Sequence, residues 1–122
     1  MILGIGNDII EVERVVNACK RQAFLKKVFT ENEKSLIEKD IKKAAGSFAV
    51  KEAVSKVFGT GFSGCGPKDI EVLRDKLGKP YVVLHGAALK KAGELGIENI
   101  FVSISNTKKY AAAVAVGEGS TR

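Results

Sequence analysis

Three side chains suited to handling a metal and a phosphate stand at two points of the chain. Asp8 lies near the N-terminus, whereas Glu52 and Lys56 lie close together in the middle. Magnesium in proteins is typically held by one or two carboxylates, with water and substrate phosphate in the other positions. A lysine one helical turn from Glu52 can offset negative charge that develops on a phosphate. The three residues therefore suggest phosphoryl chemistry, in which positioning and electrostatics do most of the catalysis.

Glu52 and Lys56 belong to residues 48–59, which have the length and composition of about three helical turns and end at a glycine. With about 100° between residues, three alanines share one sector of this helix: Ala45, Ala49 and Ala53. Glu52 and Lys56 fall within the same small, apolar sector, which should face the core. Such a pair usually lies on a solvated face and contributes only about 0.2–0.5 kcal/mol. The alternative is that a metal, a phosphate or a second acidic group lies beside them, because unpartnered buried charge is costly.

Asp8 interrupts a segment rich in isoleucine and valine, residues 2–12, whose alternation predicts a strand. Gly4 and Gly6 mark positions at which another backbone or a ligand comes close. An acid is unfavourable inside a strand. Two interpretations follow: Asp8 lies at a turn or an edge position, or it is a carboxylate held rigidly at a strand end to bind a metal.

A glycine-rich loop follows the central helix, with four glycines in the eight positions from 59 to 66. This density precludes regular structure. The loop is either a flexible connector or a surface whose backbone N–H groups approach phosphates. It lacks the Lys-Ser or Lys-Thr pair of a P-loop, and it does not follow a strand as a dinucleotide-binding motif does.

The remaining segments predict further helices and two hairpins. Helices are expected over residues 11–20, from a capping box at Thr30 and Glu33 to about residue 39, over residues 41–58 with Asp40 as the cap, and over residues 86–95. Hairpins are expected from residues 70–74 with 81–84, and from 100–105 with 110–116. We therefore predict one α+β domain over residues 1–117, with an antiparallel sheet covered by the 41–58 helix and three shorter helices around it. Residues 118–122 are expected to form a loose tail.

The overall composition, 45% hydrophobic and 28% charged over 122 residues, is typical of a soluble globular protein. No apolar run is long enough to span a bilayer, and the N-terminus lacks the basic region of a signal peptide. With two distant cysteines and no secretion signal, a reduced protein in the cytoplasm is expected. The net charge of +6 implies an acidic partner: nucleic acid, an anionic membrane, a polyphosphate or an acidic protein.

Much of this positive charge falls between residues 14 and 27, where Phe24 and other apolar residues are interleaved with Arg14, Lys20, Arg21, Lys26 and Lys27. The stretch is either a solvated face above a core stripe or a docking face for an acidic partner helix. Aromatic residues are only 7% of the chain and do not cluster as base-stacking platforms do, which weakens a single-stranded nucleic-acid interpretation.

Several motifs stand in order along the chain: GIGNDI from residue 4, FAVKEAVSKVFG from residue 48 with Thr60-Gly61 after it, DIEV from residue 69, GKP from residue 78 and VSISNTKKYAAA from residue 102. In these motifs the chain resembles the holo-acyl-carrier-protein synthases, the small trimeric class of 4′-phosphopantetheinyl transferases, over residues 1–117. The resemblance implies a 4′-phosphopantetheinyl transferase-like fold.

The resemblance also implies an enzyme of fatty acid biosynthesis that moves phosphopantetheine from coenzyme A to a serine of apo acyl carrier protein and releases adenosine 3′,5′-bisphosphate. Asp8 and Glu52 match the magnesium ligands of the family, and Lys56 matches a lysine near the pyrophosphate. Mg²⁺ would bridge the pyrophosphate oxygens. The serine proton would pass to Glu52 through a water or to a metal-bound hydroxide, and the sequence does not choose between the two.

In the family, coenzyme A lies between subunits of a homotrimer. Gly59 and Gly61 match residues of one subunit that contact coenzyme A, and the Ser105-Asn106-Thr107 turn matches the segment that the neighbouring subunit contributes. Many relatives carry histidine where Asn106 stands. Asparagine hydrogen-bonds a phosphate or a ribose but carries no proton at neutral pH, so an acid or base role at this position does not carry over.

The basic stretch matches the region of the family that docks acyl carrier protein, with Arg14, Arg21 and Phe24 as the expected contacts. Acyl carrier proteins are acidic along their recognition helix, so this docking also accounts for the net charge. The resemblance implies neither a nucleic-acid partner nor a membrane partner.

Two other classes of function are weighed against this one. A small basic nucleic-acid-binding domain explains the charge but not Asp8 with Glu52, which would repel phosphates unless a metal intervened. A steep salt dependence on generic RNA or DNA, with Mg²⁺ irrelevant, would favour it. In a purely structural interaction module, Glu52 and Lys56 would form a buried pair, and Glu52→Gln would mainly lower stability.

Overall fold

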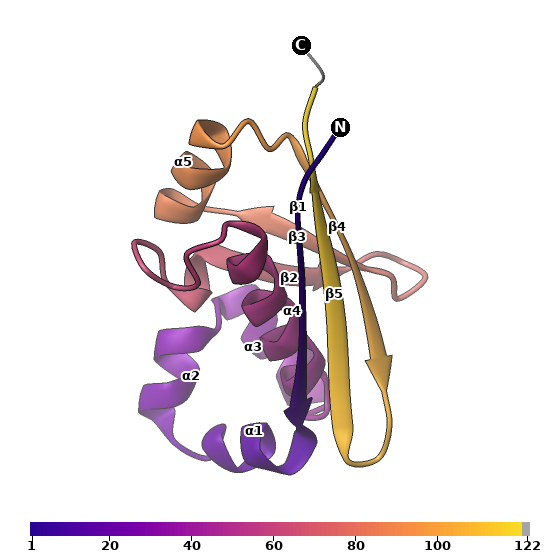
Figure 1. The fold of residues 1–122 in the computed structure, drawn as a ribbon. Helices are drawn as coiled ribbons and strands as arrows, with labels where there is room; N and C mark the ends of the chain where they lie inside the picture. The colour runs from indigo at the N-terminus through magenta and orange to yellow at the C-terminus, as the bar shows by residue number, and fades with distance from the viewer. Residues whose placement is uncertain (121–122) are drawn as a thin grey trace.

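The computed structural model describes residues 1–120 and places two antiparallel sheets beside one long helix (Figure 1). In the larger sheet, β5 (Tyr110–Glu118) lies between β1 (Ile2–Glu11) and β4 (Asn99–Asn106). The smaller sheet is the hairpin of β2 (Ile70–Arg74) and β3 (Pro80–Leu84), and β3 lies next to β4. The α+β class and both predicted hairpins are confirmed, and the expected antiparallel sheet is divided in two.

The central helix α4 (Lys43–Val57) packs across the larger sheet and forms most of the core with it. Gly6 of β1 lies so close to this helix that a Cβ atom there would be 2.0 Å from the carbonyl oxygen of Ala53. A Cβ atom at Gly4 would be 2.6 Å from the carbonyl oxygen of Val57. The prediction that these glycines mark a close approach is confirmed, and the approach brings the side chains of α4 to the edge of β1.

We expect Gly6→Ala to lower the free energy of unfolding by about 3 kcal/mol or more, because the added methyl group meets a backbone carbonyl rather than a flexible side chain. Denaturant unfolding followed by circular dichroism measures the change. Gly93→Ala in α5 is the matched control, since a Cβ atom there has nothing within 4 Å and alanine favours a helix by about 0.5–1 kcal/mol. Equal losses in the two variants would contradict the close approach.

Four shorter α-helices and one 3₁₀ helix, η1 (Pro67–Asp69), accompany α4 within residues 1–120; the α-helices are α1 (Val12–Ala18), α2 (Gln22–Val28), α3 (Glu31–Lys39) and α5 (Gly86–Glu94). The predicted shorter helices are confirmed as α1, α3 and α5. The expectation of three shorter helices is wrong, because α2 was not predicted. The missed signal is the spacing of Phe24, Val28 and their apolar neighbours Leu25 and Phe29, which is helical and packs into a second core cluster with α1. No helix in this part of the chain combines the length and apolarity that crossing a bilayer requires.

The two predicted helix caps have different outcomes. The Thr30 hydroxyl accepts from the Glu33 N–H at 3.2 Å, and the Glu33 Oε1 accepts from the Thr30 N–H at 2.9 Å, so the capping box is confirmed. Asp40 instead accepts from the Lys42 N–H at 3.1 Å, within a turn, and α4 begins only at Lys43. The expectation that Asp40 caps a helix from residue 41 is wrong, because its carboxylate bonds its own backbone two residues on.

The loose tail expected over residues 118–122 does not hold for its first three residues. Glu118 ends β5 and pairs with both Ile2 and Asn99. The Gly119 N–H donates to the Met1 carbonyl at 3.0 Å, and the Ser120 N–H donates to a Glu98 carboxylate oxygen at 2.6 Å. These partners lie at the N-terminus and at the start of β4, far from the tail in sequence, so no local pattern predicts them. Residues 121–122 lie outside the described residues.

Candidate active site

Asp8 is held within β1, where it pairs in register with Ala113 of β5. Alternation along the strand places its side chain on the same face as Gly6, toward α4. β1 is an edge strand of the sheet. The prediction that Asp8 lies at an edge position is therefore confirmed. The predictions that it lies at a turn or at the end of a strand are wrong, because it lies inside β1. Continuous pairing with β5 on either side of Asp8 overrides the poor strand propensity of an acid.

Lys56 reaches Asp8 from α4. Its Nζ donates to Asp8 Oδ1 at 3.2 Å and to the Asn7 carbonyl at 2.8 Å. The Lys56 side chain is 50% exposed and that of Asp8 is 19% exposed. Asp8 is thus the second acidic group expected beside the charged sector of the helix, and this sector opens at the edge of β1 rather than being sealed in the core.

Glu52 lies one turn before Lys56 and is partly buried. Burial raises the pKa of the Glu52 carboxyl, the negative charge of Asp8 raises it further, and Lys56 opposes both. Two carboxylates that repel each other in this way form the donor set that a divalent cation stabilises. No cluster of three or more His, Cys, Asp or Glu side chains placed to hold a metal occurs in residues 1–120. Because magnesium typically takes only one or two protein carboxylates, Asp8 and Glu52 nevertheless fit it.

A cavity of about 550 Å³ opens beside the Asp8–Lys56 pair, and Ser105 of β4 is part of its lining. Asn106 ends β4, and Thr107 follows at the tip of the β4–β5 hairpin, where its N–H donates to the Tyr110 carbonyl at 2.8 Å. The structure therefore lines one cavity with Ser105, Asp8 and Lys56, although β5 separates the strand of Ser105 from β1 and alternation turns Ser105 to the face away from α4. It places Asn106 and Thr107 beyond that cavity, at the hairpin tip.

The glycine-rich loop leaves α4 directly after Lys56. Gly59, Gly61 and Gly64 have φ angles of 80°, 59° and 87°, which only glycine adopts without strain. A Cβ atom at Gly59 or Gly61 would have nothing within 4 Å, so the backbone at both positions faces open space. This exposed backbone next to Lys56 is accessible to a ligand.

Contacts from α5 and α4 give the same loop a defined shape. Lys91 of α5 donates to the Ser63 carbonyl at 2.8 Å and contacts the Thr60 hydroxyl. The Gly61 N–H donates to the Ser55 carbonyl at 3.2 Å. Of the two interpretations of this segment, the structure favours a formed surface over a flexible connector.

The three expected docking residues lie together. Arg14 of α1 and Phe24 of α2, with Arg21 at the start of α2, line a cavity of about 760 Å³. The Phe24 ring lies 6.0 Å from the ring of Phe48, which precedes Glu52 by one turn on α4. Ile9, the residue after Asp8, lines both cavities. The groove that these three residues line therefore adjoins the carboxylate site.

Known proteins are similar to this chain in sequence and in fold. The profile of the 4′-phosphopantetheinyl transferase superfamily matches residues 4–115, which include Asp8, Glu52 and Lys56. The chain belongs to the 4′-phosphopantetheinyl transferase superfamily. The holo-[acyl-carrier-protein] synthase of Lachnoclostridium phytofermentans is 58% identical over 118 residues, which are 97% of each chain.

Solved structures of 4′-phosphopantetheinyl transferases agree with the fold. The acyl carrier protein synthase of Plasmodium yoelii with ADP bound is 40% identical, has a TM-score of 0.88 and is matched over 99% of this chain and 98% of that one. The holo-(acyl-carrier-protein) synthase of Bacillus anthracis in complex with CoA (3′,5′-ADP) is 35% identical, with a TM-score of 0.81 and a match over 98% and 99%. The resemblance and the transferase class are confirmed, and these relatives give no support to the nucleic-acid-binding hypothesis.

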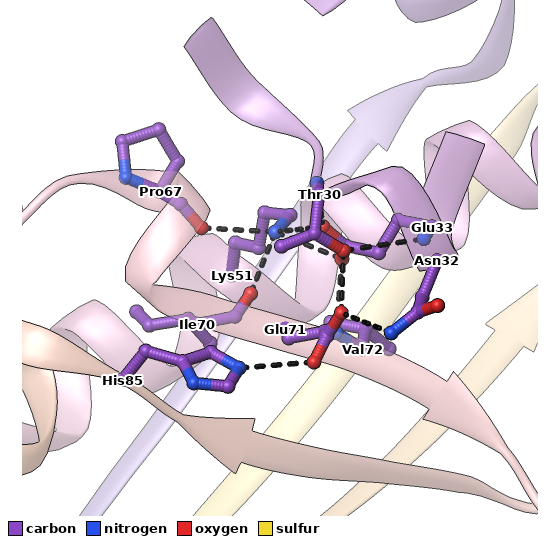
Figure 2. Close-up of polar contacts among 9 residues, drawn as sticks. All are labelled: Thr30, Asn32, Glu33, Lys51, Pro67, Ile70, Glu71, Val72 and His85. Carbon is purple, nitrogen blue, oxygen red and sulfur yellow. Dashed lines mark hydrogen bonds and ion pairs between the residues drawn. The ribbon is translucent and has the colours of Figure 1, made fainter. Parts of the chain in front are cut away.

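A buried ion pair that the sequence did not predict joins Glu33 of α3 to Lys51 of α4 (Figure 2). Their side chains are 1% and 0% exposed. The Lys51 Nζ donates to Glu33 at 2.9 Å and to the carbonyl oxygens of Pro67 and Ile70 at 2.9 and 2.6 Å. The buried pair that a structural module would need is thus Glu33–Lys51, and the expectation that Glu52 and Lys56 form it is wrong.

Glu71 of β2 extends this buried network (Figure 2). It accepts hydrogen bonds from the Thr30 hydroxyl at 2.5 Å and from the Asn32 amide at 3.3 Å, and its Oε1 lies 2.9 Å from the Nε2 of His85. Burial acts to raise the pKa of Glu71, but these three hydrogen bonds together hold it below its ordinary value. The network joins α3, α4 and the smaller sheet. Its members are far apart in sequence, so no spacing rule predicts it.

Proposed function

We propose that this transferase moves the 4′-phosphopantetheine group of coenzyme A onto a serine hydroxyl of apo acyl carrier protein in the cytoplasm, for fatty acid biosynthesis. The observation that carries the proposal is the meeting of Asp8, Glu52 and Lys56 at the edge of β1, in a chain similar to synthases solved with ADP or CoA. The glycine-rich loop supplies open backbone next to Lys56.

In the proposed reaction, the serine oxygen forms a bond to the phosphorus that carries pantetheine. The bond from that phosphorus to the bridging oxygen breaks, and adenosine 3′,5′-bisphosphate leaves. The serine proton passes to Glu52 through a water. Lys56 offsets the charge that builds on the leaving phosphate.

Asp8 and Glu52 are the residues proposed to hold Mg²⁺, because Asp8 raises the cost of negative charge on Glu52 and a cation would offset it. When bound, the metal offsets the charge of the pyrophosphate. Lys56 already donates to the Asp8 carboxylate at 3.2 Å, which holds that carboxylate beside α4.

The decisive experiment is mass spectrometry of an apo acyl carrier protein incubated with this protein, coenzyme A and Mg²⁺, with an EDTA control. A gain of about 340 Da that EDTA abolishes is expected for one phosphopantetheine transferred with the help of a metal. No gain with several carrier proteins, from well-folded enzyme, would overturn the proposed function.

The groove of Arg14, Arg21 and Phe24 is proposed to dock the acidic carrier protein beside the carboxylate site. We expect Arg14→Ala and Arg21→Ala each to raise KM for the carrier about tenfold, with kcat nearly unchanged, because such charges guide encounter and register. The effect should shrink at high salt. Lys39→Ala, which removes an exposed charge at the end of α3, is the control and should leave KM unchanged. A similar rise in all three variants would indicate net charge rather than a docking site.

The face of the larger sheet turned away from α4 is proposed to pack against other copies in a homotrimer. Ile5, Ile9, Phe101 and Val114 lie on this face by alternation and are exposed. Packing of this face would bring the 105–107 turn of a neighbouring copy toward the carboxylate site. Light scattering coupled to size-exclusion chromatography gives the number of copies directly.

A further inference from the structure

Lys91 of α5 contacts the middle of the glycine-rich loop, residues 59–66. Its Nζ donates to the Ser63 carbonyl at 2.8 Å and contacts the Thr60 hydroxyl. The same nitrogen lies 3.9 Å from the point that a Cβ atom of Gly64 would occupy. One ammonium group therefore bridges two separate points of the loop.

Other groups fix the two ends of this loop. Near the end of α4, the Gly61 N–H donates to the Ser55 carbonyl at 3.2 Å. At the other end, the Gly66 N–H donates to Asp69 Oδ2 at 3.3 Å. Among the described residues, Asp69 and Lys91 are the side chains from outside the loop that hydrogen-bond to it. Lys91 is therefore the side chain that secures the part of the loop between its ends.

The position of Lys91 is set by the packing of α5. The lysine is half-buried at the border of the face that places Ala88 and Ala92 in the core. None of the ion pairs within residues 1–120 involves it. A cation that meets only a hydroxyl and a carbonyl leaves its positive charge beside the loop, where it favours an anionic ligand.

The loop in this shape keeps backbone donors free for a ligand. Some of its N–H groups donate within the chain, those of Gly59, Gly61, Ser63 and Gly66. The intervening N–H groups have no acceptor in residues 1–120, namely those of Thr60, Phe62, Gly64 and Cys65. Backbone N–H groups fixed in a turn are suited to binding the oxygens of an anion. The loop begins directly after the turn of α4 that carries Lys56, so these donors lie next to the candidate active site.

We propose that Lys91 is a positioning residue for the transferase reaction, which holds the glycine-rich loop in the shape that binds coenzyme A. Coenzyme A offers phosphate and amide oxygens to the free N–H groups of the loop. The ammonium group of Lys91 is already bound to the loop, so it acts through the loop and not by contact with the donor. This inference rests on the proposed function and assigns to α5 a part in the affinity for the donor.

Steady-state rates with coenzyme A varied, at saturating carrier protein and Mg²⁺, test this role. We expect Lys91→Gln to raise KM for coenzyme A about tenfold and to leave kcat nearly unchanged, because the loss of a charged hydrogen bond disorders a binding surface and leaves the reacting groups in place. Lys91→Arg should keep most of the affinity, because a guanidinium can donate to both loop oxygens. Lys90→Gln is the matched control, since it removes the exposed cation one residue earlier on α5 and should change neither constant.

Amide hydrogen exchange of the free protein, followed by NMR, gives a second readout that does not depend on activity. Lys91→Gln should speed exchange at Gly61 and Ser63, whose N–H groups are bonded only while the loop keeps its shape. Lys90→Gln should leave both exchange rates unchanged. Thermal unfolding of each variant shows that the comparison is made on folded protein.

An unchanged KM for coenzyme A in Lys91→Gln, or the same rise in Lys90→Gln, would overturn the positioning role. So would a loss of kcat with early unfolding and an unaltered KM, since Lys91 would then support only the fold. If the unmodified chain transfers nothing while Lys91→Gln still speeds exchange in the loop, the proposed function fails by itself. Unaltered exchange in Lys91→Gln would refute the role of Lys91 whatever the chain transfers.

Discussion

Glu52→Gln is expected to lower kcat about 100-fold or more while the protein keeps, or slightly gains, thermal stability. The loss follows from removal of the proposed general base, which is also a proposed metal ligand, and removal of such a base alone typically costs a factor of about 10²–10⁴. The stability follows from the raised pKa of this carboxyl. Folding then favours its protonated form, so stability falls as pH rises from the ordinary pKa to the raised one. Glutamine removes this cost at neutral pH.

The Mg²⁺ concentration needed for half-maximal rate should correspondingly fall as pH rises through the raised pKa of Glu52, because Mg²⁺ binds the ionised carboxylate, and this dependence should be absent in the residual activity of Glu52→Gln. Asp8→Asn should instead increase the Mg²⁺ concentration needed for half-maximal rate. Chromatographic separation of apo and holo carrier protein gives the rates. Glu94→Gln removes an exposed carboxylate of α5 and serves as the control. A variant at position 52 that unfolds but keeps its rate per folded molecule would support the structural-module hypothesis instead.

The convergence of Asp8, Glu52 and Lys56 was predictable because local rules decide most of it. The small residues of α4 and the glycines of β1 both indicate close packing, and the two elements meet where those residues are. The spacing of about 100° per residue placed Glu52 and Lys56 on the packed side of the helix, where buried charge needs a partner. The structure shows that Asp8 is the acidic partner of Lys56. What the sequence misplaced was the position of Asp8 within its strand, because strand pairing is decided by residues about 105 positions away.

The features that the sequence did not predict are those that depend on long-range contacts. α2 was merged with a basic stretch, because its charges obscured a short apolar face that packs on α1 and α4. The capping box already accounts for a glutamate at position 33. The sequence therefore gave no further indication that Glu33 also pairs with Lys51. Lys91 looked like an ordinary helix cation until the structure showed its contacts with Thr60 and Ser63, which lie 31 and 28 residues earlier.

Lys51→Met is expected to lower the free energy of unfolding by about 3–5 kcal/mol, which is the usual cost of removing one partner of a buried ion pair. The substitution leaves the Glu33 carboxylate buried without its cation, and it deprives the carbonyl oxygens of Pro67 and Ile70 of a donor (Figure 2). Denaturant unfolding measures the loss. Adding Glu33→Gln should recover part of it, because the double variant buries no unpaired charge.

Lys56→Met is the matched comparison, since it makes the same replacement five residues later on the same helix. Lys56 is half exposed, and the loss of its pair with Asp8 should cost less than about 1 kcal/mol of stability. Its turnover should nevertheless fall far more than that of refolded Lys51→Met under stabilising conditions, because Lys56 faces the site and Lys51 faces the core. Equal stability losses in the two lysine variants would mean that the Glu33–Lys51 pair contributes no more to the fold than a surface pair. A large loss of stability in Lys51→Met, with a large loss of turnover in Lys56→Met, would show that α4 uses Lys51 to stabilise the fold and Lys56, on another face, for the reaction.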